Sequence, residues 1–317
     1  MEKLINLLSK FGATFLPINK YTFPLKMISS EMPVGIKYKA GVSAQLKSAV
    51  LLAGLNSYGN TIIEEQIISR DHTENLLMKN IQCIKIIKKK KKIIKVKGKS
   101  YLNPLNFNIG GDPSSAAFFT ALTLLNKNST LKIKNVGLNP TRTGFYEILK
   151  KQKVKINFKN IIKDNNEIRG DILIKSSKLK PMNVPASLYP RTTDEYLILF
   201  VLASLTNGVS TFRGISELKG KESSRAHEMK KILNQIGIKS ILRKDEMKIF
   251  GHGMIDAKRK KINVENLGDH RVAMCGFLLA ILTNAETNIK NFETVFTSSP
   301  SFLKIMKNLG AKYEIKK

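Results

Sequence analysis

The sequence contains few acidic residues. Asp and Glu number 24 against 54 Lys and Arg, which gives a formal net charge of +30. A balance of this sign favours nucleic acid, an anionic membrane or anionic substrates as partners. Most of the excess is lysine spread along the whole chain without interleaved aromatic residues. We therefore expect anionic substrates and no nucleic-acid partner.

Cysteine is also scarce. Cys83 and Cys275 are far apart and flanked by apolar residues, which excludes a disulfide framework and favours a reducing compartment. Neither cysteine has metal-ligand spacing with a histidine, so no zinc signature is present. We interpret Cys275 as a core residue, because a lone cysteine between apolar neighbours is usually buried.

Long apolar runs are missing. The longest, Leu197 to Leu205, includes a serine and is far shorter than the roughly 20 residues of a membrane-spanning helix. Met1 to Phe11 shows helical periodicity in place of a signal-peptide pattern. These observations predict a cytoplasmic protein with no membrane partner.

A polar segment that ends at Arg225 follows a strand-like run. Ser223 is predicted to cap the next helix, and the free N–H groups of that helix, with Lys221 and Arg225, would form an anion site. Glu222 lies between these cations and is suited to proton transfer beside an anionic substrate. The alternative is a capped surface helix with an i,i+3 ion pair between Glu222 and Arg225.

Glycine precedes this segment. Gly220 is predicted to allow a sharp turn. A phosphate-binding P-loop is excluded, because Gly214 to Lys221 has one residue too many between the glycines and Glu222 stands where Ser or Thr should hold magnesium.

Residues favoured at helix starts precede apolar positions at helical spacing throughout the chain. The predicted starts are Ser43, Asp71, Asp112-Pro113, Asn139-Pro140, Thr193 or Asp194, Ser223, Asp269 and Ser298-Ser299-Pro300. A strand-like run lies between the two helices of each pair, and two strands joined by a basic turn follow the second helix. The predicted unit is strand, helix, strand, helix, strand, strand, repeated about every 70 to 80 residues.

Four such units are predicted to begin near residues 36, 105, 185 and 260. Met1 to Gly12 begins none of them and is typical of the second helix of an earlier unit, with closing strands at Ala13–Pro17 and Lys26–Ser29. We therefore expect an upstream segment to be missing. The lysine run Lys88 to Lys92 is predicted to be a solvated hairpin tip, because such a run should not be buried.

Several motifs together resemble the 5-enolpyruvylshikimate-3-phosphate (EPSP) synthases. The segment from Lys221 to Arg225 resembles the family's Lys-Glu-Ser/Thr-Asp-Arg, with Ser224 replacing aspartate. Asp194-Glu195-Tyr196 resembles its Asp-Glu-Tyr-Pro, with Leu197 replacing proline. The remaining matches are Asp269–Met274, which resembles Asp-His-Arg-Met/Ile-Ala-Met, and three blocks of the glyphosate-tolerant branch, Ser43–Ala49, Ser69–Glu74 and Gly111–Ser115.

The resemblance implies an α/β, two-lobed enolpyruvyl transferase fold built from repeated βαβαββ units, with the site in the cleft between the lobes. Residues 1–109 would form a partial N-terminal lobe of about one and a half units, and residues 110–317 a C-terminal lobe of three. The family's early lysine-containing block, its Asn-Ala/Ser-Gly-Thr loop and an associated arginine have no counterpart here.

The resemblance also implies transfer of the enolpyruvyl group of phosphoenolpyruvate to the 5-hydroxyl of shikimate 3-phosphate by addition and elimination, with no metal or other cofactor, in a monomer. Asp194 would be the base, and Glu222 the proton donor and acceptor at the methylene carbon. Residues implied for shikimate 3-phosphate are Ser43, Ala44, Gln45, Arg70, Asp194 and Lys221. Residues implied for phosphoenolpyruvate are Gln45, Arg225 and Arg271.

Purely structural roles are the alternative for two of these residues. Asp194 would serve a helix N-terminus by interacting with its dipole, and Ser43 would be only an N-cap. At the level of the whole chain, one alternative is an inactive truncated remnant that binds anions. Another is the enolpyruvyl transferase that acts on UDP-N-acetylglucosamine, which is less well matched because Cys83 and Cys275 are not placed like its reactive loop cysteine.

Overall fold

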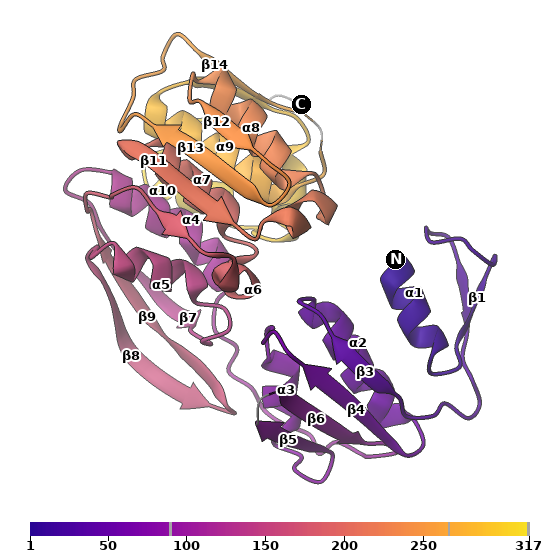
Figure 1. Ribbon diagram of the computed structural model, residues 1–317. Coiled ribbons are helices and arrows are strands. Elements are labelled where there is room, and N and C mark those ends of the chain that lie inside the picture. Colours follow the sequence, from indigo (N-terminus) through magenta and orange to yellow (C-terminus); the bar gives the residue numbers. More distant parts are fainter. Residues whose placement is uncertain (89–90, 266, 316–317) are drawn as a thin grey trace. The chain divides into compact units, whose positions relative to one another are not determined.

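The computed structural model describes residues 1–88, 91–265 and 267–315. The chain folds into two compact units, each with its own sheets and helices (Figure 1). Unit 1 comprises Met1–Ile109 and Ile162–Ile168, and unit 2 comprises Gly110–Ile161 and Arg169–Lys317.

Unit 1 is built around a four-stranded mixed sheet. Its elements are α1 (Glu2–Ser9), β1 (Thr14–Leu16), β2 (Lys26–Ile28), β3 (Lys37–Ala40), α2 (Ala44–Asn56), β4 (Asn60–Glu65), α3 (His72–Leu77), β5 (Ile84–Lys88) and β6 (Lys92–Lys97). The sheet has the order β3-β4-β6-β5; β3 and β4 are parallel and the other neighbours antiparallel. A separate antiparallel pair joins β1 and β2.

The core of unit 1 lies between helices α1 and α2 and one face of this sheet. Side chains alternate along a strand, so every second residue of β4 and β6 points to the helices. Ile63 and Ile94 are cross-strand partners on this inner face, and both are fully buried with Leu51 of α2. The pattern buries a charged pair as well.

That charged pair corrects one prediction. Glu65 is the cross-strand partner of Lys92, and the two residues are 1% and 8% exposed. The end of the lysine run is therefore buried, because Lys92 pairs with carboxylates on the inner face. Residues 89 and 90 of the predicted hairpin tip lie outside the described residues.

The described residues of unit 2 form three further sheets, and the tip of one of their hairpins, Ile162–Ile168, belongs to unit 1. Its elements are α4 (Pro113–Leu125), β7 (Thr130–Gly137), α5 (Gly144–Lys151), β8 (Ile156–Asp164), β9 (Glu167–Lys175), β10 (Asn183–Val184), η1 (Ala186–Leu188), α6 (Tyr189–Thr192), α7 (Tyr196–Ser204), β11 (Gly208–Arg213), η2 (Ser216–Gly220), α8 (Arg225–Gln235), β12 (Ser240–Leu242), β13 (Glu246–Gly251), β14 (Lys261–Val264), α9 (His270–Thr283), β15 (Glu286–Ile289), η3 (Phe292–Thr297) and α10 (Phe302–Asn308). The sheet orders are β7-β9-β8, β10-β11-β13-β12 and β14-β15.

The sheet β10-β11-β13-β12 repeats the plan of β3-β4-β6-β5. In each, the first two strands are parallel and the rest antiparallel. A parallel pair requires a crossover connection, which α2 supplies in unit 1 and α7 supplies in unit 2. The helices that follow the second strand, α3 and α8, occupy equivalent places in the two plans.

Three helices form the centre of unit 2. Every residue of α7 is buried, as are most residues of α4 and α9. A helix that is apolar on all sides has no solvent face, and these three pack against one another within the unit (Figure 1). Their N-terminal ends carry the polar motifs found in the sequence.

Helix starts were predicted with mixed accuracy. Ser43, Asp112 and Asp269 are N-caps whose side chains accept backbone N–H groups, as predicted. The predicted start at Asn139-Pro140 is wrong, because the Asn139 side chain accepts the backbone N–H and hydroxyl of Thr141. The helix there begins at Gly144.

Candidate active site

Two helix starts of unit 2 meet at a buried carboxylate. Asp269 caps α9 by accepting the backbone N–H of Arg271 at 3.1 Å. The same carboxylate accepts Nε of Arg225 at 3.0 Å and the hydroxyl of Ser223 at 2.8 Å. Asp269 therefore ties the start of α8 to the start of α9.

Arg225 is enclosed by carboxylates. Its side chain is 1% exposed, and its Nη2 lies 2.5 Å from Oε2 of Glu222. Its Nη1 lies 3.7 Å from Oδ1 of Asp194. The ion pair between Arg225 and Glu222, which was the alternative interpretation of the sequence, is therefore present. The same guanidinium also lies near Asp194, a residue of a second motif.

Asp194 lies between two arginines. Nη2 of Arg271 is 3.7 Å from Oδ2 of Asp194, and Nη1 of Arg271 donates to the Asp194 backbone carbonyl at 3.3 Å. Three motifs that are distant in the sequence therefore bring Asp194 and the two guanidinium groups to the same place. Lys221 and Glu222 are exposed in the η2–α8 connection, just before Arg225 in the chain.

Charge shapes this cluster. Burial acts to raise the pKa of Asp269, but the Arg225 guanidinium and the hydrogen bonds from Arg225 and Ser223 outweigh it and hold that pKa below its usual value. Burial, with the Arg271 charge, lowers the pKa of His270. Asp269 is therefore ionised and His270 neutral at neutral pH.

One local prediction for this segment is wrong. The N-cap of α8 is Ser224, which makes no side-chain capping bond. Ser223 instead donates its hydroxyl to Asp269, which is 46 positions away in the sequence. The chain does bend directly after Gly220, where η2 ends, although the φ of Gly220 is not positive and an added Cβ would meet nothing within 4 Å.

A second set of polar side chains surrounds Glu195, the residue that follows Asp194 in the chain. Glu195 is 2% exposed and accepts a hydrogen bond from the Ser114 hydroxyl. Arg142 donates to Ser114 at 2.7 Å and to Asp112 at 2.9 Å. Burial raises the pKa of Glu195, and the Asp194 charge adds to this rise. The sequence did not point to Arg142, and it indicated Asp269 only as a helix cap. The signal available for Asp269 was its position two residues before Arg271.

The remaining predicted residues belong to unit 1. Ser43 caps α2 by accepting the N–H of Leu46 at 3.4 Å, and Ala44 and Gln45 form the first turn of that helix. Arg70 is half-buried and follows the buried Ser69, just before α3. Unit 1 thus carries Ser43, Ala44, Gln45 and Arg70, while unit 2 carries Asp194, Lys221, Glu222, Arg225 and Arg271.

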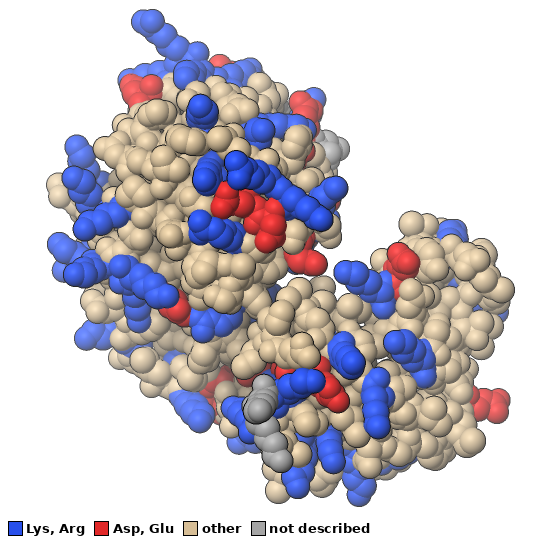
Figure 2. All heavy atoms as spheres, in the orientation of Figure 1, with Lys and Arg blue, Asp and Glu red and all other residues tan. Residues whose placement is uncertain are grey.

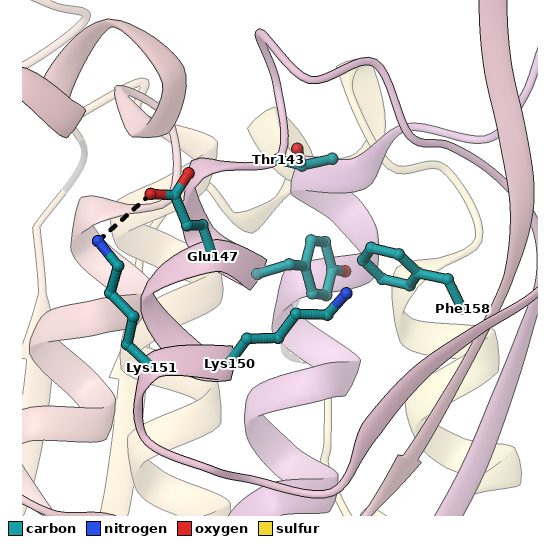
Figure 3. Close-up of a pocket in the computed structure, with 6 residues that line it drawn as sticks. Thr143, Glu147, Lys150, Lys151 and Phe158 are labelled. Atoms are coloured by element: carbon teal, nitrogen blue, oxygen red, sulfur yellow. Dashed lines mark ion pairs between the residues drawn. The ribbon is translucent and has the colours of Figure 1, made fainter.

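A pocket lies elsewhere in unit 2. It has a volume of about 470 Å³ and is lined by Thr143, Tyr146, Glu147, Lys150, Lys151 and Phe158. Figure 3 shows the Lys150 chain running toward the Phe158 ring, with its Nζ 3.8 Å from the ring centroid. The predicted site residues do not contribute to it, and we do not assign the active site here.

The surface charge is spread widely. Figure 2 shows Lys and Arg scattered over the visible faces of both units, not gathered in one patch. Within residues 1–88, 91–265 and 267–315, no group of three His, Cys, Asp or Glu side chains is arranged to hold a metal ion. Among the same residues no helix has the length and apolar character needed to cross a membrane.

Comparison with known proteins agrees with the motifs. The family model described as EPSP synthase (3-phosphoshikimate 1-carboxyvinyltransferase) matches residues 1–306. The 3-phosphoshikimate 1-carboxyvinyltransferase of Zymomonas mobilis is 34% identical over 99% of this chain and 70% of its own length. That of Thermodesulfovibrio yellowstonii is 37% identical over 98% of this chain and 71% of its own.

Solved structures agree as well. The EPSP synthase from Acinetobacter baumannii superposes with a TM-score of 0.84 at 31% identity, over 100% of this chain and 72% of the other. The enolpyruvyl transferase NikO from Streptomyces tendae has a TM-score of 0.73 at 14% identity, over 98% of this chain and 71% of the other, which shows a shared fold. From the family match, the relatives and the fold together, the chain belongs to the EPSP synthase (3-phosphoshikimate 1-carboxyvinyltransferase) family.

Proposed function

We propose that this protein transfers the enolpyruvyl group of phosphoenolpyruvate to the 5-hydroxyl of shikimate 3-phosphate and releases phosphate. Family membership supports the reaction, and one observation supports the site: Asp194, Arg225 and Arg271 come together from three separate motifs of unit 2. A base beside two guanidinium groups suits a reaction that removes a hydroxyl proton next to anionic substrates.

We propose that Asp194 is the base for the 5-hydroxyl. Its carboxylate is 15% exposed, so it is partly accessible while its neighbours hold its orientation. Glu222 is the proposed proton donor and acceptor at the methylene carbon, because its carboxylate is 47% exposed on the Arg225 side of the cluster.

Arg225 and Arg271 are the proposed ligands of phosphoenolpyruvate, together with Gln45. Arginine matches carboxylate and phosphate with two parallel donors. We assign shikimate 3-phosphate to a set of residues from both units. That set is Ser43, the backbone of Ala44, Gln45, Arg70, Asp194 and Lys221.

The proposed reaction has two balanced steps. In the addition, Glu222 gives a proton to the methylene carbon of phosphoenolpyruvate, the 5-hydroxyl oxygen bonds to its C2, and the hydroxyl proton goes to Asp194. In the elimination, the new methyl group returns a proton to Glu222, the C2–phosphate oxygen bond breaks, and the leaving phosphate takes the proton held by Asp194. Inorganic phosphate leaves and the enolpyruvyl ether remains.

Phosphate release from phosphoenolpyruvate with shikimate 3-phosphate tests this function. Asp194→Asn should lower kcat at least about 10²-fold while shikimate 3-phosphate still binds by calorimetry. Asp256→Asn is the matched control, since Asp256 lies on the surface of unit 2 with its side chain 58% exposed. Normal turnover in Asp194→Asn would remove Asp194 from its role, and a parent protein that neither binds the substrate nor releases phosphate would contradict the function.

We also propose that the protein is a cytoplasmic monomer. Both cysteines are buried and free, which is typical of a reducing compartment. Light scattering coupled to gel filtration should give a mass near the 35.6 kDa of one chain. A mass of two chains or more would contradict the monomer.

A further inference from the structure

Unit 1 buries a cluster of four charged side chains that the proposed roles do not use. Nζ of Lys47 lies 2.8 Å from Oε1 of Glu65 and 2.7 Å from Oε1 of Glu74. Nζ of Lys92 lies 3.2 Å from Oε2 of Glu65 and 3.1 Å from Oε1 of Glu74. Each lysine thus bridges both glutamates, and the formal charges of the cluster cancel.

The local structure explains why these groups meet. Glu65, the last residue of β4, and Lys92, the first residue of β6, are cross-strand partners on the inner face. Lys47 extends from the first turns of α2, and Glu74 belongs to α3. The cluster therefore joins a strand pair to helices α2 and α3.

Glu65 also holds the loop that leads to Arg70. Its Oε1 accepts the backbone N–H of Ser69 at 2.8 Å and the Ser69 hydroxyl at 2.7 Å. The Lys47 ammonium donates to the same oxygen at 2.8 Å. One carboxylate oxygen thus receives a donor from α2 and two donors from the residue immediately before Arg70.

A cluster of this kind is weak evidence for stability alone. Removing four charges from water is costly, and well-packed apolar residues often serve a core as well. Burial acts to raise the pKa of Glu65, but the contacts with Lys47 and Ser69 lower it below its usual value, so these contacts are strong ones. Unlike apolar packing, the directional bonds of the cluster fix the position of the loop relative to α2.

Helix α2 and the loop before α3 carry the residues of unit 1 that are proposed to bind substrate. Ser43, Ala44 and Gln45 stand at the start of α2, one turn before Lys47. Arg70 stands next to Ser69. We propose that Glu65 is a positioning residue that sets the spacing of Arg70 and the α2 N-terminus for a phosphate monoester. This inference rests on the proposed function for the identity of that ester, shikimate 3-phosphate.

The experiment compares Glu65→Gln with Glu64→Gln. Glu64 is the neighbouring residue of β4; its side chain is 40% exposed, and its Oε2 lies 3.8 Å from Nζ of Lys91. The first readout is hydrogen exchange of the Ser69 and Arg70 amides, which needs no ligand. Glu65→Gln should speed exchange at these amides at least about tenfold, because an amide oxygen is a weaker acceptor than a carboxylate. Glu64→Gln should leave it unchanged.

The second readout is shikimate 3-phosphate affinity by calorimetry, with and without Arg70. Glu65→Gln should weaken binding about tenfold or more, and Glu64→Gln should not. In an Arg70→Ala background the Glu65→Gln change should add little, because a residue that acts through Arg70 has nothing left to position. A purely structural effect would instead weaken both backgrounds equally, and that result would overturn the inference.

Ser69→Ala covers the case in which Glu65→Gln does not fold. It removes one donor to Glu65 and leaves the charges balanced. It should weaken binding by about threefold to tenfold, again only when Arg70 is present. If the parent protein does not bind shikimate 3-phosphate, the proposed function fails, while unchanged amide exchange in Glu65→Gln and Ser69→Ala would sink the positioning role alone.

Discussion

Arg225 contacts three carboxylates, so its side chain both supports the fold and serves the proposed phosphoenolpyruvate site. Nε is engaged by Asp269 and Nη2 by Glu222. A lysine at this position has one compact ammonium and does not span both partners. Arg225→Lys should therefore raise the KM for phosphoenolpyruvate at least about tenfold and lower the free energy of unfolding by about 1–3 kcal/mol.

Steady-state kinetics and urea unfolding measure these two effects. Arg213→Lys is the control, because Arg213 is 46% exposed in its ion pair with Glu246; it should change stability by less than about 0.5 kcal/mol. An Arg225→Lys protein with the parent's KM for phosphoenolpyruvate would remove Arg225 from that site.

Glu195 gives a prediction for pH dependence. Burial, with the Asp194 charge, raises its pKa above the ordinary value of 4.5. The native carboxyl group therefore keeps its proton where the unfolded one has lost it, so its contribution to stability is lost as pH rises through the native pKa. Glutamine does not titrate, so the stability of Glu195→Gln relative to the parent should increase as pH rises from 4.5 toward 8.

Urea unfolding at several pH values checks this prediction, and Glu293→Gln, an exposed position on η3, should show no such trend. A stability difference that stays constant or shrinks with rising pH would contradict a raised pKa for Glu195.

The motif resemblance named residues that the fold brings together, but it did not predict their surroundings. Asp194, Arg225 and Arg271 lie in motifs that are local in sequence, they meet in unit 2, and their chemical roles stay predictions. Lys92 was misread as solvated, since its burial depends on a cross-strand partner and on Glu74, 18 positions away. Burial of a charge depends on the tertiary partner, which no local pattern contains.

Helix caps act at the scale of the element, and Asp112 is the clearest case. It accepts the backbone N–H groups of Ser114 at 3.2 Å and Ser115 at 3.1 Å at the start of α4. It also pairs with Arg142 at 2.9 Å. Asp112→Ala should cost about 1–2 kcal/mol of unfolding free energy.

Thr143→Ala is the matched control, because Thr143 is the N-cap of α5 and makes no side-chain capping bond. It should cost less than about 0.5 kcal/mol. Equal losses in the two variants, measured by urea unfolding, would mean that the Asp112 hydrogen bonds do not stabilise α4.

Helix starts were predicted well where the capping side chain bonds a nearby residue of its own helix. Ser43, Asp112 and Asp269 cap helices through neighbours two or three residues away, so a local pattern is sufficient. Ser223 fits that pattern equally well, yet its hydroxyl bonds Asp269 of another motif. A cap prediction fails where a distant acceptor competes for the same side chain.

At the scale of the whole molecule, the net charge of +30 raises the question of polyanion binding. Lys and Arg are scattered over the visible faces of the units (Figure 2). The rival function, an anion-binding remnant, predicts duplex binding through lysines that is salt-sensitive and indifferent to sequence, whereas a synthase predicts specific binding of the small phosphate ester. For a protein that neutralises several phosphates, raising salt from about 50 to 200 mM lowers duplex affinity by about 10³-fold or more.

Shikimate 3-phosphate should behave differently. Its proposed ligands include a helix start and oriented, partly buried guanidinium groups, and only a few charges are neutralised, so the same change in salt should alter its affinity less than about tenfold. Fluorescence polarisation with a labelled duplex and calorimetry with the ester, on the same protein at the two salt concentrations, separate the cases. Salt-sensitive duplex binding that is indifferent to sequence, with no ester binding at either salt concentration, would favour the anion-binding remnant over the synthase, because oriented ligands for one small substrate should hold the ester at both salt concentrations.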